Sequence, residues 1–192
     1  MGWFRRHKRQ MMTFRAFLTL SEFITDDSMK RLRECEYRGH IGKRETLKDI
    51  NAWSYGELMD AGKLFSSQNT MVEGVCRFAE MTEKEVMNAP AQDVVAFVNF
   101  MVSEIKRAGD LFESCHVEPT FEEKRAGIDK LQFGLFGVLD WYARRMGIID
   151  HEWVMENVKW LYIYKCLQMD TENNKYERRL QKILYSKDNK RK

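Results

Sequence analysis

Apolar residues recur at helical spacing along most of this chain, and short polar stretches separate one run from the next. Residues 91–113 are the most hydrophobic segment, and their apolar side chains surround most of a helix, as in a helix that several neighbours bury. Residues 158–169 are again strongly apolar, and residues 170–185 place apolar side chains at helical spacing. Because no clear strand pattern lies between these runs, the sequence predicts an all-α, multi-helix bundle of about eight to ten helices.

Polar residues mark the expected helix ends. Thr82 is followed three residues later by a glutamate, the pattern of a capping box, and Ser54 and Asp150 are suitable N-caps. Gly147 is expected to end a helix, since glycine readily takes the left-handed conformation of a helix terminus. A last helix is expected to begin at Asp170, and the final eight residues are expected to be disordered.

One pattern occurs twice in the chain. Ile50–Leu58 and Ile128–Phe136 both read as isoleucine, two residues, a large apolar residue, a polar residue, an aromatic residue, glycine, any residue and an apolar residue. Residues 85–90 and 153–158 form a second echo. Internal repeats indicate related structural units, so we expect two related helical units packed on each other. The expected segments are a basic N-terminal tail (1–12), an N-terminal helical lead-in (13–44), a first helical unit (45–113), a connection (114–126), a second helical unit (127–185) and a basic C-terminal tail (186–192).

The formal net charge of +3 is unevenly distributed, because both ends of the chain are basic and the middle is mildly acidic. Basic ends can contact phosphates or an acidic partner, and the alternative is that they are solvated ends that improve solubility. Arg144 and Arg145 follow Trp141 and Tyr142; this group can contact nucleic acid, or its long basic side chains can cover their own aromatic face. The candidate contacts to phosphate or to an acidic partner are Arg5, Arg6, Lys8, Arg9, Arg144, Arg145, Lys190 and Arg191.

Residues with catalytic or metal-binding chemistry are present, but their spacing does not favour either use. The cysteines Cys35, Cys76, Cys115 and Cys166 form no CxxC pair and have no zinc-ligand spacing, so we expect free thiols in a reducing cytoplasm. Cys115 and His116 are adjacent, and adjacent residues rarely form a nucleophile–base pair. Paired carboxylates lie where helix starts favour negative charge. The sequence therefore predicts no enzyme, no catalytic residue, no metal and no cofactor.

Three stretches of this chain resemble a family of phage proteins. The helix entered by Tyr55-Gly56 or Phe133-Gly134, followed by a short helix and a buried helix, is similar to small helical morphogenesis proteins of tailed bacteriophages. Residues 82–94 resemble a stretch of phage tail assembly chaperones. Residues 133–145, with the ending at 176–184, resemble versions from phages of gut Bacteroidetes. The resemblance covers about residues 45–185, and none of its motifs is catalytic.

The resemblance implies a non-enzymatic role in virion morphogenesis. Such chaperones hold the tape-measure protein until tail tube subunits polymerise around it, which requires apolar grooves that accept amphipathic helices. The implied partners are other phage structural proteins, namely tape measure, tail tube or portal, together with further copies of the chain. Nucleic acid could also be contacted through the basic tails. No stretch approaches the ~18 apolar residues of a membrane helix, so no membrane partner is expected, and the expected location is the host bacterial cytoplasm.

The candidate partner-binding residues are the apolar side chains of the two repeated patterns and of the helix that follows the second. Each of them has core packing as its alternative role. They are Tyr55, Leu58, Met59, Phe133, Phe136, Trp141 and Tyr142.

Two other functions are compatible with the same sequence. One is a structural virion component, a head–tail connector or ring protein that is retained in the particle. The other is a small nucleic-acid-binding or host-takeover regulator, whose binding would weaken steeply with salt.

Overall fold

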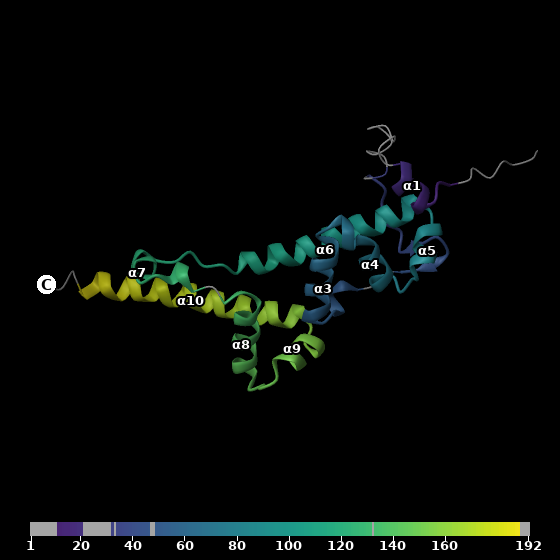
Figure 1. Cartoon of the computed structure of the whole chain (residues 1–192). Coiled ribbons are helices and arrows are strands. Elements are labelled where there is room, and N and C mark those ends of the chain that lie inside the picture. The colour runs from purple at the N-terminus through teal and green to yellow at the C-terminus, as the bar shows by residue number, and fades with distance from the viewer. Residues whose placement is uncertain (1–10, 21–31, 33, 47–48, 132, 189–192) are drawn as a thin grey trace, which may run out of the picture. The chain divides into compact units, whose positions relative to one another are not determined.

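The computed structural model describes residues 11–20, 32, 34–46, 49–131 and 133–188. Within these ranges the chain forms nine α-helices and one antiparallel pair of two-residue strands, so the predicted all-α fold is confirmed (Figure 1). The helices are α1 (Phe14–Leu20), α3 (Tyr55–Phe65), α4 (Gln68–Phe78), α5 (Glu83–Asn88), α6 (Ala91–Ser114), α7 (Phe121–Arg125), α8 (Gly134–Met146), α9 (His151–Asn157) and α10 (Trp160–Asp188). Two 3-10 helices, η2 (Ile50–Ala52) and η3 (Ile128–Lys130), precede α3 and α8.

The chain divides into two compact parts, each assembled from segments that are distant in sequence. Lobe 1 combines the described residues before position 49 with Asp60–Ile105, and lobe 2 combines Asp49–Met59 with the described residues from Lys106 onward. This division differs from the expected boundaries, in which residues 49–59 belong with the helices that follow them. Whether the two lobes arose from one repeated unit stays a prediction.

Lobe 1 is built around aromatic side chains from several of its elements. Phe97 of α6 is almost fully buried, and its ring meets those of Tyr37 and Phe65 at centroid distances of 5.5 and 6.4 Å. Phe65 also approaches Phe78 of α4, at 6.0 Å. Aromatic pairs at these separations add stability beyond the area they bury, so this cluster fixes α4 and α6 within the lobe.

A short hairpin lies beside the start of α6. Strand β1 (His40–Ile41) pairs with β2 (Arg44–Glu45), although the sequence has no clear strand pattern. Gly42 makes the turn possible because its φ of +61° is strained for any residue with a side chain. The Gly42 N–H donates to Asp93 Oδ2 at 2.9 Å, and Ile41 is buried, so tertiary contacts order this polar segment.

The expected long apolar helix is present as α6. Ala91, Val94 and Met101 in its first half and Ala108 in its second half are almost fully buried, whereas Val102 is exposed. Neighbours therefore bury part of the helix in both of its halves.

In lobe 2 the start of α3 is hydrogen-bonded to the short connection between α9 and α10, which we call the joint of these helices. The Tyr55 N–H donates to the Val158 carbonyl oxygen at 2.8 Å, and the Trp160 N–H donates to the Trp53 carbonyl oxygen at 3.2 Å. Together these two bonds form an isolated antiparallel bridge between Ser54 and Lys159. They explain why residues 49–59 belong to lobe 2.

In lobe 1 an equivalent pair of backbone hydrogen bonds holds the start of α1. The Phe14 N–H donates to the Ala89 carbonyl oxygen, and the Ala91 N–H donates to the Met12 carbonyl oxygen, both at 2.9 Å. In each lobe, therefore, the first residue of a helix is bonded to the joint between a short helix and a long one. Val86 of the short helix α5 and Val154 of the short helix α9 are both fully buried beneath these joints.

Helix α10 continues without interruption from Trp160 to Asp188, so the prediction of a new helix at Asp170 is wrong. The polar residue Thr171 does not cap a helix start; its hydroxyl is buried and donates to the Cys115 carbonyl oxygen at 2.9 Å. The helix also extends into the segment that was expected to be a disordered tail. Residues 189–192 and 1–10 of the expected tails lie outside the described residues.

Candidate partner-binding surface

Nucleophiles and metal ligands are not assembled into a site in the described part of the chain. Cys115 is buried and its thiol contacts the Leu111 carbonyl oxygen at 3.7 Å, whereas its neighbour His116 is exposed. Within the described ranges, no three His, Cys, Asp or Glu side chains form a group able to hold a metal ion. None of the four cysteines, which all lie in the described residues, forms a disulfide bond.

A pocket of about 800 Å³ lies in lobe 1 beside the β1–β2 turn and the start of α6. Its lining contains both acidic and basic groups, among them Lys43 and Asp93. Asp93 already accepts the Gly42 N–H, and the Tyr37 hydroxyl, also in the lining, is 2.6 Å from the Thr46 hydroxyl. Burial raises the pKa of Tyr37. Asp93 and Tyr37 therefore already bond within the lobe's own structure.

Exposed apolar side chains are the most distinctive surface feature of the described residues. Five large apolar side chains are exposed in lobe 1 and sixteen in lobe 2, all of the latter between Phe121 and Tyr185. Single exposed apolar residues are ordinary, but contiguous groups mark interaction surfaces. Most of the large apolar side chains exposed on the described residues therefore lie in lobe 2.

The two copies of the repeated pattern have the same local structure. Each consists of a 3-10 helix, η2 or η3, followed within a few residues by an α-helix, α3 or α8. In both copies the isoleucine begins the 3-10 helix and the aromatic–glycine pair lies at the start of the α-helix. The sequence repeat therefore corresponds to a repeated structural element.

The two copies differ in what covers them. In the first copy all four apolar positions are buried in the core of lobe 2, whereas in the second copy all four are exposed. The buried set is Ile50, Trp53, Tyr55 and Leu58. The exposed set is Ile128, Leu131, Phe133 and Phe136, and we call it the η3–α8 patch.

Two glycines shape the start of α8 and the position of Phe133. Gly134 has a φ of +53° at the start of α8, a conformation that favours glycine. A Cβ atom at Gly137 would lie only 2.7 Å from the Phe133 Cβ, so glycine there lets Phe133 rest against the helix backbone. Phe133 is 67% exposed and Phe136 is 59% exposed.

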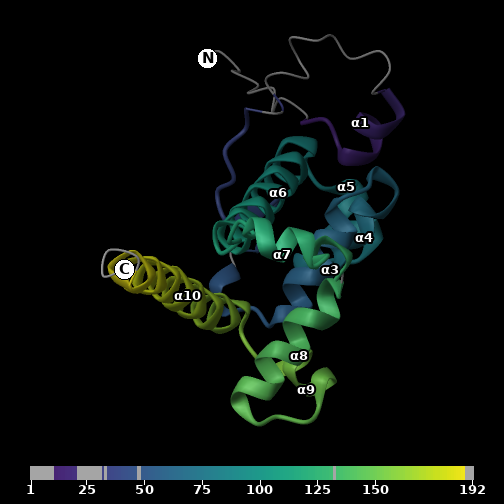
Figure 2. The same ribbon diagram turned by 90° about the vertical axis from the view of Figure 1, so that its left-hand side faces the viewer.

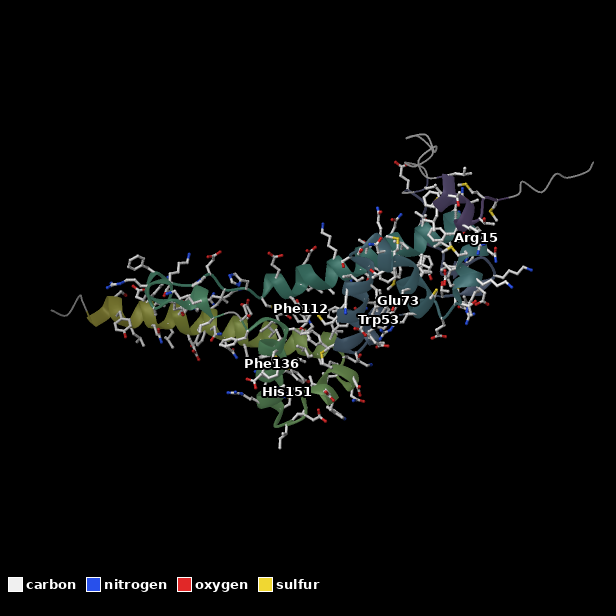
Figure 3. The ribbon with its side chains drawn as sticks, in the orientation of Figure 1. Arg15, Trp53, Glu73, Phe112, Phe136 and His151 are labelled. Atoms are coloured by element: carbon white, nitrogen blue, oxygen red, sulfur yellow. The ribbon has the colours of Figure 1, made fainter. Side chains whose placement is uncertain are left out.

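The start of α9 borders this patch. The Phe136 ring stacks on the His151 imidazole at a centroid distance of 5.0 Å, and Figure 3 shows the two side by side. His151 Nε2 lies 3.5 Å from the Asp140 carboxylate, which also pairs with Arg144 at 2.8 Å. Helices α8 and α9 fold back on each other (Figure 2). The result is an apolar surface with a polar border, which is the usual composition of a protein-binding surface.

Several residues predicted to contact a partner lie inside the protein instead. Tyr55, Leu58 and Tyr142 are almost fully buried, so their predicted role as partner contacts is corrected to core packing. Burial raises the pKa of Tyr55 to about 12 and also raises the pKa of Tyr142. Met59 and Trp141 are half-buried. Phe133 and Phe136 alone of the predicted set are largely exposed.

The predicted basic group on α8 is engaged within lobe 2. Arg145 pairs with Asp170 of α10 and lies over the Trp141 ring, with 5.9 Å between its guanidinium carbon and the ring centroid. The hydrogen bond to Asp170 raises the pKa of the Arg145 guanidinium. Arg144 is exposed but pairs with Asp140 on its own helix. The remaining predicted basic contacts, Arg5, Arg6, Lys8, Arg9, Lys190 and Arg191, lie outside the described residues.

Sequence reasoning missed part of the exposed apolar surface. Leu131 belongs to the repeated pattern and was detectable as the counterpart of Trp53, and Trp153 belongs to the second echo, but Ile149 has no such signal. Ile149 is 94% exposed because it lies in the loop between α8 and α9, outside any helical periodicity.

Among the described helices, none is both long and apolar enough to cross a membrane. Comparison with known proteins finds no matching family model, no matching curated protein and no matching solved structure.

Proposed function

We propose that this chain is a non-enzymatic helix-binding protein of phage assembly, a tail assembly chaperone that holds amphipathic segments of the tape-measure protein on the η3–α8 patch. The phage assignment rests on the sequence resemblance. The binding mode rests on one structural contrast, in which the second copy of the repeated pattern exposes the four positions that the first copy buries.

The first copy indicates what the second copy is suited to bind. Ile50, Trp53 and Tyr55 pack against the joint of α9 and α10, and Trp160 covers Ile50. Ile128, Leu131 and Phe133 present the same types of apolar side chain in the same order without such a cover. An amphipathic helix that lays its apolar face across these side chains would supply the missing cover.

Two other functions compete with the chaperone, and the experiments below distinguish them from it. A head–tail connector or ring protein would use the same patch for a permanent neighbour in the particle. A nucleic-acid-binding regulator finds less support in the described residues, because Arg144 and Arg145 already pair with carboxylates.

Binding of a model helix tests the surface directly. The probe is a fluorescein-labelled amphipathic peptide of leucine, alanine and lysine, about 18 residues or five turns long, compared with a shuffled peptide of the same composition. Phe133→Ser and Phe136→Ser are each expected to raise the Kd for the amphipathic peptide at least about tenfold, or about 1.4 kcal/mol. Phe121→Ser is the matched control, because Phe121 is equally exposed but lies on α7. Equal binding of both peptides, or insensitivity to the patch variants, would refute the surface.

Particle composition tests the biological role. Quantitative mass spectrometry is applied to purified particles, and separately to complexes captured with the tagged chain and with its Phe136→Ser variant. A chaperone is absent from particles and captures the tape-measure protein only when the patch is intact. Fixed stoichiometric presence in particles would replace the chaperone by a ring or connector protein.

A further inference from the structure

A second uncovered surface runs along α10. Side chains at alternating steps of four and three residues share one side of this helix. They are Tyr162, Cys166, Met169, Asn173, Tyr176, Leu180 and Ile183, and we call them the α10 stripe. Four members of the stripe are each more than half exposed: Tyr162, Met169, Tyr176 and Ile183. Leu180 and Asn173 are also exposed, and Cys166 is half-buried.

The opposite side of α10 is the side that lobe 2 uses. Tyr164 and Thr171 are buried there, seven residues apart. Seven residues further on, Arg178 pairs with Glu123 of α7 at 2.9 Å and donates to the Glu118 carbonyl oxygen. Because these contacts occupy the opposite side, most of the stripe faces away from them. Cys166 is the exception, because its thiol contacts Arg145 of α8.

The spacing of the stripe is that of a two-stranded coiled coil. In such a structure, residues at alternating steps of three and four form the contact line between two helices. The stripe contains one polar position, Asn173, and a single asparagine in such a line is a known means of fixing register and the number of strands. From Tyr162 to Ile183 the stripe is roughly 33 Å long, which is enough for three heptads.

We propose that the α10 stripe pairs with the α10 stripe of a second copy of this chain, and that the two helices run antiparallel. With the two-fold axis between Asn174 and Lys175, every stripe residue from Cys166 to Ile183 meets another stripe residue. The contacts are Cys166 with Ile183, Met169 with Leu180 and Asn173 with Tyr176 of the second copy, each occurring twice by symmetry.

Charge complementarity favours a second copy of this chain as the partner that covers the α10 stripe. In this register the exposed Glu172 of each copy faces the exposed Arg179 of the other, on the flank of the contact line. Glu172 also contacts Lys175 on its own helix at 2.9 Å through one carboxylate oxygen, which leaves the other oxygen available. Asp170 faces Glu177 of the second copy, but Asp170 is already neutralised by Arg145.

Other pairings of the same stripes place like charges together. Parallel helices would place Glu172 of each copy against Glu177 of the other. Antiparallel helices shifted by one heptad would place the two Arg179 side chains against each other, and the two Glu177 side chains likewise. The register proposed here is the one that pairs opposite charges on a flank.

Sedimentation equilibrium tests the association. The wild-type chain is expected to move from the monomer mass of 22.9 kDa to twice that mass as its concentration rises. Leu180→Lys and Ile183→Lys are each expected to raise the dimer dissociation constant at least about tenfold. Tyr185→Lys is the control, since Tyr185 is more exposed but lies on the opposite side of the helix. Circular dichroism checks that the variants keep their helices. A monomer at every soluble concentration overturns the proposal, and so does a dimer that ignores the stripe variants.

Charge reversal determines the orientation. Glu172→Arg is expected to weaken the antiparallel dimer, because the introduced arginine then faces Arg179, and the double variant with Arg179→Glu is expected to restore it. A parallel dimer would respond to Glu172→Arg in the opposite direction, because the new arginine would face Glu177. Stronger association of the single variant therefore overturns the antiparallel arrangement.

A disulfide test gives an independent measurement of register. Cys166 lies opposite Ile183 of the second copy in the proposed register. Ile183→Cys, in a chain whose cysteines other than Cys166 are replaced by serine, is therefore expected to form crosslinks between Cys166 and the introduced cysteine under mild oxidation. Crosslinks between two Cys166 residues would indicate parallel helices. This proposal does not depend on the proposed function: Phe133→Ser and Phe136→Ser are expected to leave the dimer unchanged, and Leu180→Lys to leave peptide binding unchanged.

Discussion

The indole nitrogen of Trp160 donates a hydrogen bond of 2.7 Å to the backbone carbonyl oxygen of Ile50. Both residues are buried, and they are separated by most of lobe 2 in the sequence. The bond satisfies a carbonyl of η2 that water does not reach, and it fixes the first copy of the repeated pattern on α10.

Trp160→Phe is expected to lower the free energy of unfolding. The Ile50 carbonyl keeps the hydrogen bond from the Trp53 N–H but loses the one from the indole, which costs about 0.5–1.5 kcal/mol, and the smaller ring adds a cavity term. Urea denaturation followed by circular dichroism measures the change. The matched control is Trp153→Phe, for which a change below about 0.5 kcal/mol is expected because Trp153 is half exposed on α9. Equal effects of the two variants would contradict the role of the bond.

Two glycines within helices are expected to respond oppositely to alanine. A Cβ at Gly56 would lie 2.9 Å from the Met155 carbonyl oxygen, and backbone atoms cannot move aside easily, so Gly56→Ala should destabilise the protein by about 1–3 kcal/mol. Nothing lies within 4 Å of a Cβ at Gly109 in α6, so Gly109→Ala should stabilise it by about 0.5–1 kcal/mol. Thermal denaturation of both variants tests the pair, and a stabilising Gly56→Ala would show that α3 does not approach α9 closely.

Alkaline pH is expected to destabilise lobe 2 through Tyr55. Its folded-state pKa is raised to about 12 by burial, so its contribution is fully present below the ordinary tyrosine pKa of about 10 and is lost as pH rises toward 12. Phenolate absorbance measured alongside circular dichroism should show one tyrosine that ionises only as the fold is lost. Tyr55→Phe should raise the midpoint of alkaline unfolding; an unchanged midpoint would assign the alkaline transition to other groups.

Acid is expected to loosen the contact between α7 and α10. The pKa of Glu123 is lowered, first by the backbone N–H of Thr120 that its carboxylate accepts and then by Arg178. A lowered folded-state pKa means that the stabilisation is present above the ordinary carboxyl pKa and is lost as pH falls through the folded-state value. The protection factors of the α7 amides, which correct for the slower intrinsic exchange in acid, should therefore fall at acidic pH in the wild type.

Glu123→Gln separates the two contacts of this carboxylate. Glutamine can still accept the Thr120 N–H, but it cannot form the ion pair with Arg178. The variant should show faster α7 exchange already at neutral pH, together with a weaker dependence on acid. Wild-type protection factors that do not change with acid would show that the ion pair does not hold α7.

Local signals in the sequence predicted local structure well. The predicted capping box at Thr82 and the predicted N-cap at Asp150 are present because a side chain that bonds a nearby backbone N–H needs no distant partner. Asp170 carries the same kind of signal and fails, because the distant Cys115 carbonyl engages Thr171 and the helix continues. Predictions of this type hold where the partner is within one turn and fail where the partner is distant.

The partner-binding surface was predictable only in part, for a related reason. Tyr55 and Phe133 occupy the same position of the repeated pattern, yet one is buried and the other is 67% exposed. The difference does not lie in the pattern itself; it lies in Lys159 and Trp160, which cover the first copy alone. Periodicity identifies which residues need cover, but only the tertiary structure shows which of them receive it.

The backbone bridge between Ser54 and Lys159 also has a consequence for synthesis on the ribosome. Trp53 and Tyr55 leave the ribosome about a hundred residues before the joint that covers them, a delay of roughly 5–20 s at the usual rates of translation. During that interval Ile128–Phe136 also emerges, and it has the same apolar pattern as Ile50–Leu58. When the joint finally appears, two segments of the nascent chain compete for it, and correct maturation of lobe 2 depends on the earlier segment winning.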